Sequence, residues 1–287
     1  MTRSAAVLGH PITHSLSPVL HRAAYRSLGL DWTYEAIDVD EPQFAGFLAH
    51  LDDSWAGLSL TMPLKREVLT FLDERSANVV ATGAANTVVF DRSGSDVRLV
   101  GENTDIRGIE VALGEPGMPL ADLAHGGGDA VVLGAGATAA SALAALADAG
   151  FAEVHVVVRS LARSTAVQAA ASALGVRAHF HLTGEFLPTV EGAGVLISTL
   201  PGGAADGFAR ELASAGVRVR TDAPLLDVAY DRRPSDLGRA WQGAGGTYVS
   251  GERMLLHQAV EQVALFTGQR PDVAVMDAAL REAIGVR

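Results

Sequence analysis

The chain of 287 residues contains no cysteine, which excludes disulfides, thiolate catalysis and metal sites built on Cys ligands. It also lacks any run of about 18 consecutive apolar residues, so no membrane-spanning helix is expected. Near the N-terminus, Pro11 and several polar residues interrupt a short apolar run too early for a secretory leader. The expected location is therefore the cytoplasm.

Positive charge is in short supply. Lys and Arg number 22 against 33 Asp and Glu, a formal net charge of −11. Because a nucleic-acid backbone selects a basic face, nucleic acid is not an expected partner. A phosphate-bearing cofactor stays possible, since it needs only a local group of donors. No grouping of His and carboxylates at ligand spacing indicates a metal site.

The apolar pattern predicts two successive α/β domains. Up to about residue 105, short strands alternate with helices, including one predicted at 63–74, and Ser93-Gly94-Ser95 indicates a hairpin. From about residue 106, strands and helices follow one another regularly, as is typical of βαβ units in a parallel sheet. The last 35 or so residues are predicted helices, at 253–266 and 273–283.

A predicted strand at 130–133 runs directly into a turn of small residues that opens a helix. The turn is Gly134-Ala135-Gly136-Ala137-Thr138-Ala139. Here glycines permit a tight turn and close approach to a pyrophosphate, and the N–H groups of the new helix meet the phosphates. The alternative is a glycine-rich turn in an Ala-rich protein, and the strand–turn–helix context favours dinucleotide binding.

The end of the next strand indicates which dinucleotide. An Asp or Glu there would bind the ribose of NAD, but this chain has Arg159 and Ser160, with Arg163 one turn beyond. Two cations and a hydroxyl suit the 2′-phosphate of NADP. The alternative is a pair of ordinary surface arginines.

Three polar segments in the N-terminal half are candidates for substrate binding, and each has a structural alternative. Ser17 before Pro18 has the form of a helix N-cap, yet Ser15 and Ser17 beside a helix N-terminus also suit a carboxylate. Lys65 lies in the first turn of a predicted helix, where a cation is electrostatically unfavourable and hints at function, although such a Lys is more often a solvated surface group. Asp105 is either a helix N-cap or a functional carboxylate.

Six motifs, in order and spacing over nearly the whole chain, resemble the shikimate dehydrogenase family, and the Ala-rich composition resembles its actinobacterial members. They are GHPITHSLSP (9–18), LTMPLK (60–65), ANT (85–87), NTD (103–105), the Gly134 turn and GERMLLHQA (251–259). The resemblance implies reversible, NADPH-dependent reduction of 3-dehydroshikimate to shikimate, a step toward chorismate and the aromatic amino acids. It also implies a substrate domain (1–105), a Rossmann NADP domain (106–250) and C-terminal helices (251–287) that pack on the substrate domain. Because the nicotinamide must come within reach of the substrate, we also expect hinge motion between the domains.

The resemblance further implies residue roles. Ser15 and Ser17 would bind the substrate carboxylate, and Lys65 and Asp105 would form the catalytic pair. The remaining substrate contacts would come from Thr61, Asn86, Asp105, Tyr230 and Gln258, with Gly251 beside the nicotinamide.

The chain departs from the family at several positions. Ser59 stands where many members carry Asn, so its contact to the substrate ring would be shorter or water-mediated. Val158 replaces an Asn, Glu252 an apolar residue, and Ser198-Thr199-Leu200-Pro201 an Asn-Ala-Thr stretch.

Three alternatives stay open: an NAD-linked quinate/shikimate dehydrogenase, an aminoshikimate dehydrogenase, and a non-catalytic NADP-binding regulator on the same fold. Arg159 and Ser17 disfavour the first, and the presence of both Lys65 and Asp105 disfavours the last. The sequence hardly distinguishes an aminoshikimate dehydrogenase from a shikimate dehydrogenase. It is compatible with a monomer or a homodimer.

Overall fold

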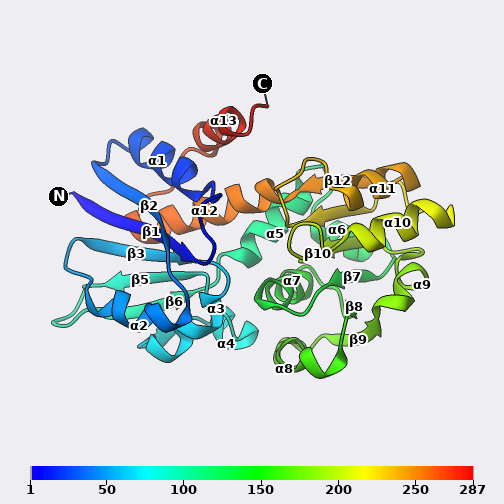
Figure 1. Ribbon diagram of the computed structural model, residues 1–287, viewed down its shortest axis with the longest axis horizontal. Helices are drawn as coiled ribbons and strands as arrows, with labels where there is room; N and C mark the ends of the chain where they lie inside the picture. The colour runs from blue at the N-terminus through cyan, green and yellow to red at the C-terminus, as the bar shows by residue number, and fades with distance from the viewer. Residues whose placement is uncertain (1, 287) are drawn as a thin grey trace. The chain divides into compact units, whose positions relative to one another are not determined.

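The computed structural model describes residues 2–286, which form two compact units (Figure 1). Unit 1 contains residues 2–104 and 255–286, and unit 2 contains Asp105–Met254. In the described part of the chain, no helix is long and apolar enough to cross a membrane.

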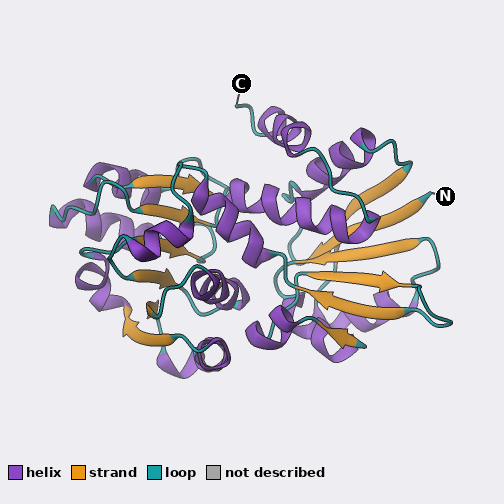
Figure 2. Cartoon of the chain, turned by 180° about the vertical axis from the view of Figure 1, so that it is seen from behind, coloured by secondary structure: helices purple, strands orange, loops and turns teal. Residues whose placement is uncertain are grey.

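Unit 1 is built on a mixed six-stranded sheet of order β2-β1-β3-β5-β6-β4 (Figure 2). Its strands are β1 (Arg3–Gly9), β2 (Trp32–Asp38), β3 (Trp55–Leu60), β4 (Glu74–Arg75), β5 (Thr87–Asp91) and β6 (Arg98–Glu102). β1 runs parallel to β2 and β3, whereas β5 pairs antiparallel with both β3 and β6. The β5–β6 pairing confirms the predicted hairpin.

Successive side chains of β1 point to opposite faces of the sheet, and on both faces they are apolar. Helices therefore cover both faces. Ala5 and Val7 pack in one apolar core with α1 (Ser17–Ser27), α12 (Gly251–Thr267) and α13 (Val273–Ala283). Ala6 and Leu8 pack in a second core with α2 (Glu41–Ala49), α3 (Leu64–Glu67) and α4 (Ala77–Thr82). The C-terminal helices therefore return to the sheet that the N-terminal half forms, as Figure 1 shows for α12 and α13.

Unit 2 is a doubly wound Rossmann sheet. All six strands are parallel, in the order β12-β11-β10-β7-β8-β9. This is the strand order of dinucleotide-binding folds, in which ligands bind at the carboxyl ends of the strands. The strands are β7 (Ala130–Leu133), β8 (Glu153–Val158), β9 (Arg177–Leu182), β10 (Val195–Ser198), β11 (Pro224–Asp227) and β12 (Thr247–Ser250).

Two apolar cores lie on opposite faces of this sheet. Val132 and Val156 share a core with α5 (Asp105–Gly114), α6 (Leu120–His125), α7 (Ala137–Asp148) and α8 (Thr165–Leu174). Val131 and Val157 face the other core, formed with α9 (Phe186–Val190), α10 (Asp206–Ala215) and α11 (Asp236–Ala244). Short 3-10 helices, η2 (Leu161–Arg163) and η3 (Thr183–Glu185), precede α8 and α9.

The helix predicted at 63–74 is wrong in length. α3 ends at Glu67 and continues only as the 3-10 helix η1 (Val68–Phe71). The chain then extends, because Glu74 and Arg75 pair with β6 as a short strand. Sheet pairing thus overrides a helical pattern whose capping signals were correct only at its start.

Candidate active site

The topology of unit 1 brings the predicted substrate residues to one edge of its sheet. β1 and β3 both end there, and the antiparallel β5 begins where β3 ends. β6 runs back and also ends at this edge. Four loops therefore meet at one place, and they carry Ser15, Thr61, Lys65, Asn86 and Thr104.

The loop between β1 and α1 is tied to the neighbouring strand β2. His10 Nδ1 lies 2.7 Å from Asp38 Oδ1, and the Ile12 N–H donates to Asp38 Oδ2 across 3.3 Å. The hydrogen bond to the Asp38 carboxylate raises the pKa of His10. Asp38 thus holds the loop from which Ser15 projects.

Ser17 does not cap α1, contrary to the N-cap interpretation. The N-cap position is Leu16, whose backbone is already helical, and Ser17 is the first helical residue. Instead, Ser15 Oγ accepts the Ser17 N–H at 3.3 Å. Because Ser15 Oγ acts there as an acceptor, its hydroxyl hydrogen is left to donate to another group, such as a carboxylate.

Backbone hydrogen bonds fix the segment that carries Thr61 and Lys65. The Thr61 N–H donates to Leu8 O at 2.9 Å, and Lys65 O accepts the Ala85 N–H at 2.8 Å. Lys65 is therefore tied to the residue directly before Asn86. Its side chain is half-buried.

The side-chain amide of Asn86 forms hydrogen bonds through both its oxygen and its nitrogen. Its Oδ1 accepts the Thr104 N–H at 2.8 Å, and its Nδ2 donates to Thr104 Oγ1 at 2.9 Å and to Gln258 Oε1 at 3.3 Å. Gln258 comes from α12, so the C-terminal helix supplies a polar group to the same edge. The structure thus brings two of the predicted substrate residues into contact.

Ser59 lies behind this edge, only 3% exposed. Its hydroxyl accepts a hydrogen bond from Tyr34 at 2.7 Å and donates to Gln262 Oε1 at 2.8 Å. Sequence reasoning missed both Tyr34 and Gln262. A detectable signal was present, since Gln258 and Gln262 lie one helical turn apart among the buried apolar residues Leu256, Ala259, Val260 and Val263.

Asp105 follows Thr104 directly and is the first residue of α5. It is 4% exposed. The structure assigns it to unit 2 as its first residue.

In unit 2, the predicted cofactor turn follows β7 and opens α7. Gly134 has φ +118°, a conformation that side chains disfavour, and a Cβ there would also collide with the Thr199 hydroxyl. Gly136 is the N-cap of α7, and Ala137 and Thr138 form its first turn, which contains no acidic residue. This helix N-terminus therefore suits negatively charged phosphates.

Most residues in the loop after β8 are exposed to solvent. Arg159 and Arg163 are exposed, and Ser160 between them is half-buried. Within residues 2–286, neither guanidinium forms a hydrogen bond or an ion pair. Both cations are thus available to a phosphate, and the region fits a dinucleotide with a 2′-phosphate.

Gly251 begins α12 next to the end of β11. A Cβ at this position would collide with the carbonyl oxygen of Val228 and lie 2.8 Å from that of Asp227. Only glycine fits there. Burial raises the pKa of Tyr230, which follows β11, and the Arg233 guanidinium lies 6.0 Å from its ring centroid.

The departure at Glu252 is accommodated by polar partners. Its buried carboxylate accepts the Ser250 hydroxyl, and Arg233 Nε lies 3.5 Å away. A charged residue thus replaces an apolar one without being left unpaired.

A second polar group lies at the carboxyl ends of β10 and β11. Asp227 is 2% exposed, and burial raises the pKa of its carboxyl. Its Oδ1 and the neighbouring Ser198 Oγ lack hydrogen-bond partners within the described residues. Sequence reasoning missed Asp227.

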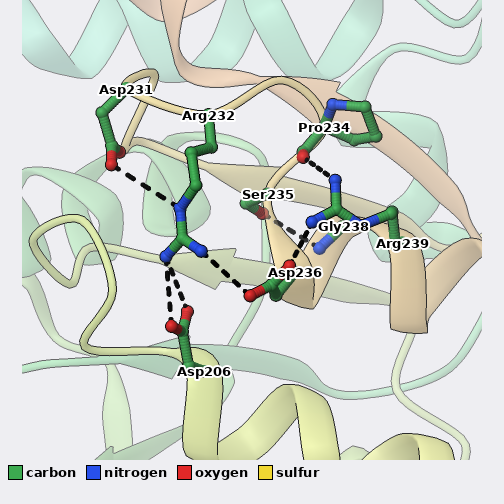
Figure 3. Close-up of polar contacts among 8 residues, drawn as sticks. All are labelled: Asp206, Asp231, Arg232, Pro234, Ser235, Asp236, Gly238 and Arg239. Carbon is green, nitrogen blue, oxygen red and sulfur yellow. Dashed lines mark hydrogen bonds and ion pairs between the residues drawn. The ribbon is translucent and has the colours of Figure 1, made fainter.

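An ionic cluster joins the loops that follow β10 and β11 (Figure 3). Arg232 lies 3.0 Å from both Asp206 and Asp236 and 3.8 Å from Asp231. Ser235 caps α11 by accepting the Gly238 N–H at 3.0 Å. The pairs are solvent-exposed, so each contributes at most about 1 kcal/mol, and the cluster restrains these loops more than it stabilises the fold.

Within residues 2–286, no group of three or more His, Asp or Glu side chains is arranged to hold a metal ion.

Two family models match the chain. The shikimate dehydrogenase substrate binding domain matches residues 7–88, and the shikimate 5′-dehydrogenase C-terminal domain matches residues 251–281. Shikimate dehydrogenase (NADP(+)) of Rubrobacter xylanophilus is 33% identical over 285 residues, covering 97% of this chain and 95% of the relative.

Solved structures of the same family align with nearly the whole chain. Shikimate dehydrogenase of Mycobacterium tuberculosis aligns with a TM-score of 0.82 and 38% identity, over 98% of this chain and 99% of that one. Shikimate 5-dehydrogenase of Thermus thermophilus, solved with NADP(H) and shikimate, aligns with a TM-score of 0.80 and 33% identity, over 98% and 99%.

Proposed function

Because the chain belongs to the shikimate dehydrogenase family, we propose that its residues perform the family reaction in the roles set out below. The enzyme is an NADP-dependent oxidoreductase that interconverts 3-dehydroshikimate and shikimate. The observation that carries the assignment of individual residues is the meeting of four loops and α12 at one edge of the unit 1 sheet.

In this proposal unit 1 binds the substrate and unit 2 binds NADP. Ser15 and Ser17 donate hydrogen bonds to the substrate carboxylate at the start of α1, where the helix N-terminus favours negative charge. Thr61, Asn86 and Gln258 bind the ring hydroxyls. Carboxylate and hydroxyl recognition together would distinguish shikimate from simpler ketones or alcohols.

The cofactor is held by the residues around the Gly134 turn. N–H groups at the start of α7 bind the pyrophosphate, and Arg159, Ser160 and Arg163 bind the 2′-phosphate. Gly251 and Tyr230 lie beside β11, at the carboxyl edge of the sheet where such folds hold the reactive ring.

Reduction of the ketone needs a hydride and a proton, and bound NADPH supplies the hydride. Lys65 Nζ, as an ammonium, stabilises the negative charge that develops on the carbonyl oxygen. The same group then donates its proton to that oxygen and is left as a neutral amine, which solvent reprotonates. Asp105 is the second member of the pair and orients Lys65 and a neighbouring hydroxyl.

A spectrophotometric assay tests this function. Purified protein is incubated with shikimate, quinate or aminoshikimate, each with NADP⁺ and with NAD⁺, and formation of the reduced cofactor is followed. We expect shikimate with NADP⁺ to be the preferred pair. A preference for quinate with NAD⁺ would contradict the proposal, and so would the absence of turnover with every pair. A cytoplasmic location and a monomeric or homodimeric state stay predictions of the sequence.

A further inference from the structure

A chain of buried hydrogen bonds leads from β2 to the predicted substrate edge, and every bond in it points the same way. The Tyr34 hydroxyl donates to Ser59 Oγ at 2.7 Å, and the Ser59 hydroxyl donates to Gln262 Oε1 at 2.8 Å. Gln262 Nε2 then donates to Thr87 Oγ1 at 3.0 Å, and the Thr87 hydroxyl donates to Asn86 Oδ1 at 2.8 Å. We call Tyr34, Ser59, Gln262 and Thr87 the donor relay.

The relay continues into the predicted substrate-binding amides. Asn86 Nδ2 donates to Gln258 Oε1, which leaves Gln258 Nε2 to donate to Leu255 O at 3.0 Å. The direction of the relay therefore favours one amide orientation at both Asn86 and Gln258. Successive bonds of the same sense also polarise and strengthen one another in a buried setting.

Gln262 is the member that makes the relay continuous. Ser59 and Thr87 are cross-strand partners on β3 and β5, and the Gln262 amide enters from α12 to bond both side chains. Its Nε2 also donates to the backbone carbonyl of Asn86 at 3.3 Å. An amide is needed here, because the residue must accept from one hydroxyl and donate to the other.

The start of the relay has a fixed sense. Tyr34 is fully buried, and burial raises its pKa well above the ordinary value, so its hydroxyl acts as a donor in the working pH range. The ring stacks on His21 with centroids 3.8 Å apart. Ser59 then has one acceptor and one donor role, both used within the protein.

We propose that Gln262 is a positioning residue for substrate binding, which acts through Thr87 and Asn86 to set the orientation of the amides that bind the ring. The inference rests on the proposed function of Asn86 and Gln258. It also gives Ser59 an indirect role, through Gln262, in place of a contact with the ring.

The test uses two variants of the full-length enzyme. Gln262→Glu keeps the size of the side chain but replaces the amide donor with an acceptor, so Thr87 turns toward residue 262 and away from Asn86. Gln262→Met keeps the length and removes both polar roles, and it remains informative if the buried carboxylate prevents folding. The matched control is Thr267→Val on the same helix, whose hydroxyl donates to Val263 O at 2.7 Å outside the relay.

We expect both Gln262 variants to raise the KM for shikimate by roughly tenfold, as for the loss of one or two buried hydrogen bonds. The KM for NADP⁺ should change by less than about twofold, since that site lies on other elements. The Thr267→Val control should show no rise in either KM.

Two results would overturn the inference. One is a KM for shikimate in Gln262→Met that equals that of the Thr267→Val control. The other is an equal rise of both KM values, which indicates general loosening of the protein. Wild-type turnover of shikimate, measured in the same series, reports on the proposed function separately from these ratios.

Discussion

Asn86 Nδ2 donates to Gln258 Oε1 across 3.3 Å, although 172 positions separate the two residues in the chain. Asn86 lies directly before β5, and Gln258 lies on α12, which the chain reaches only after it has formed the Rossmann sheet. The proposed substrate edge of unit 1 is therefore complete only when the C-terminal helix has packed on the N-terminal sheet. A catalytic role for this edge makes the following outcomes expected.

Lys65→Ala should lower kcat by about a thousandfold or more, because both electrostatic stabilisation and proton donation are lost. The KM for shikimate should change much less. Asp105→Asn should also lower kcat strongly. Steady-state kinetics on folded variants checks both, and near-wild-type kcat in Lys65→Ala would remove Lys65 from the mechanism.

Ser15→Ala and Ser17→Ala should each raise the KM for shikimate, since a hydrogen bond to a charged carboxylate contributes about 1.5–3 kcal/mol. If Ser17 were a helix N-cap, Ser17→Ala would lower the free energy of unfolding, but the structure predicts otherwise. Ser17→Ala loses no cap, because Leu16 holds that position, whereas Ser15→Ala loses the acceptor of the Ser17 N–H. Thermal unfolding and substrate titration separate the two effects, and unchanged KM values in both variants would leave only a structural role for the loop.

His21 should make the stability of the protein sensitive to acid. Burial lowers the pKa of His21 from 6.5 to about 4, and Ser17 O, 3.0 Å from Nδ1, opposes this only in part. The unfolded chain therefore binds a proton at higher pH than the folded chain does. The stabilisation is complete above about pH 6.5 and is lost as the pH falls toward 4, by about 3 kcal/mol in all.

The matched variant for this prediction is His21→Phe, which keeps a ring against Tyr34 but does not titrate. Urea unfolding between about pH 7 and pH 4 should show a steeper loss of stability in the wild type than in the variant. Parallel pH profiles would mean that His21 does not contribute. The comparison cancels the carboxylates that titrate in both proteins.

Local patterns predicted most of the fold. The glycine turn before α7, the hairpin of β5 and β6, and the helix Val273–Ala283 were all predicted from spacing and turn residues, which act over short distances. Two local predictions failed, each for its own reason. The pattern at 63–74 was helical, but pairing of Glu74 and Arg75 with β6 ended the helix. The Ser-Pro signal at Ser17 was misleading because the backbone at Leu16 is already helical.

The site was predicted less completely than the fold. Family motifs led to Asn86 and Gln258, but Tyr34 and Gln262 belong to no motif that sequence reasoning used. Their importance comes from burial and from contacts between distant segments, for which one sequence carries no direct signal. Only Gln258 and Gln262, one helical turn apart on α12, indicated that polar side chains line this buried region.

In the proposed function, the residues after β8 determine the choice between NADP⁺ and NAD⁺. Arg159→Ala should weaken the binding of NADP⁺ and leave the binding of NAD⁺ almost unchanged, since only NADP⁺ carries the 2′-phosphate. An acidic residue at position 158 would not create an NAD⁺ site, because the side chain of Val158 is buried in the core. Arg159 is the first exposed residue after β8. Equal losses with both cofactors in Arg159→Ala would show that this arginine only supports the fold.

The most direct test of the account is the catalytic efficiency of the wild-type enzyme for shikimate, measured side by side with NADP⁺ and with NAD⁺. Exposed arginines that can pair with a phosphate, and the lack of a carboxylate for a free ribose, predict a preference for NADP⁺ of roughly a hundredfold. Comparable kcat/KM with the two cofactors would contradict this account, because Arg159 and Arg163 would then be surface charges only.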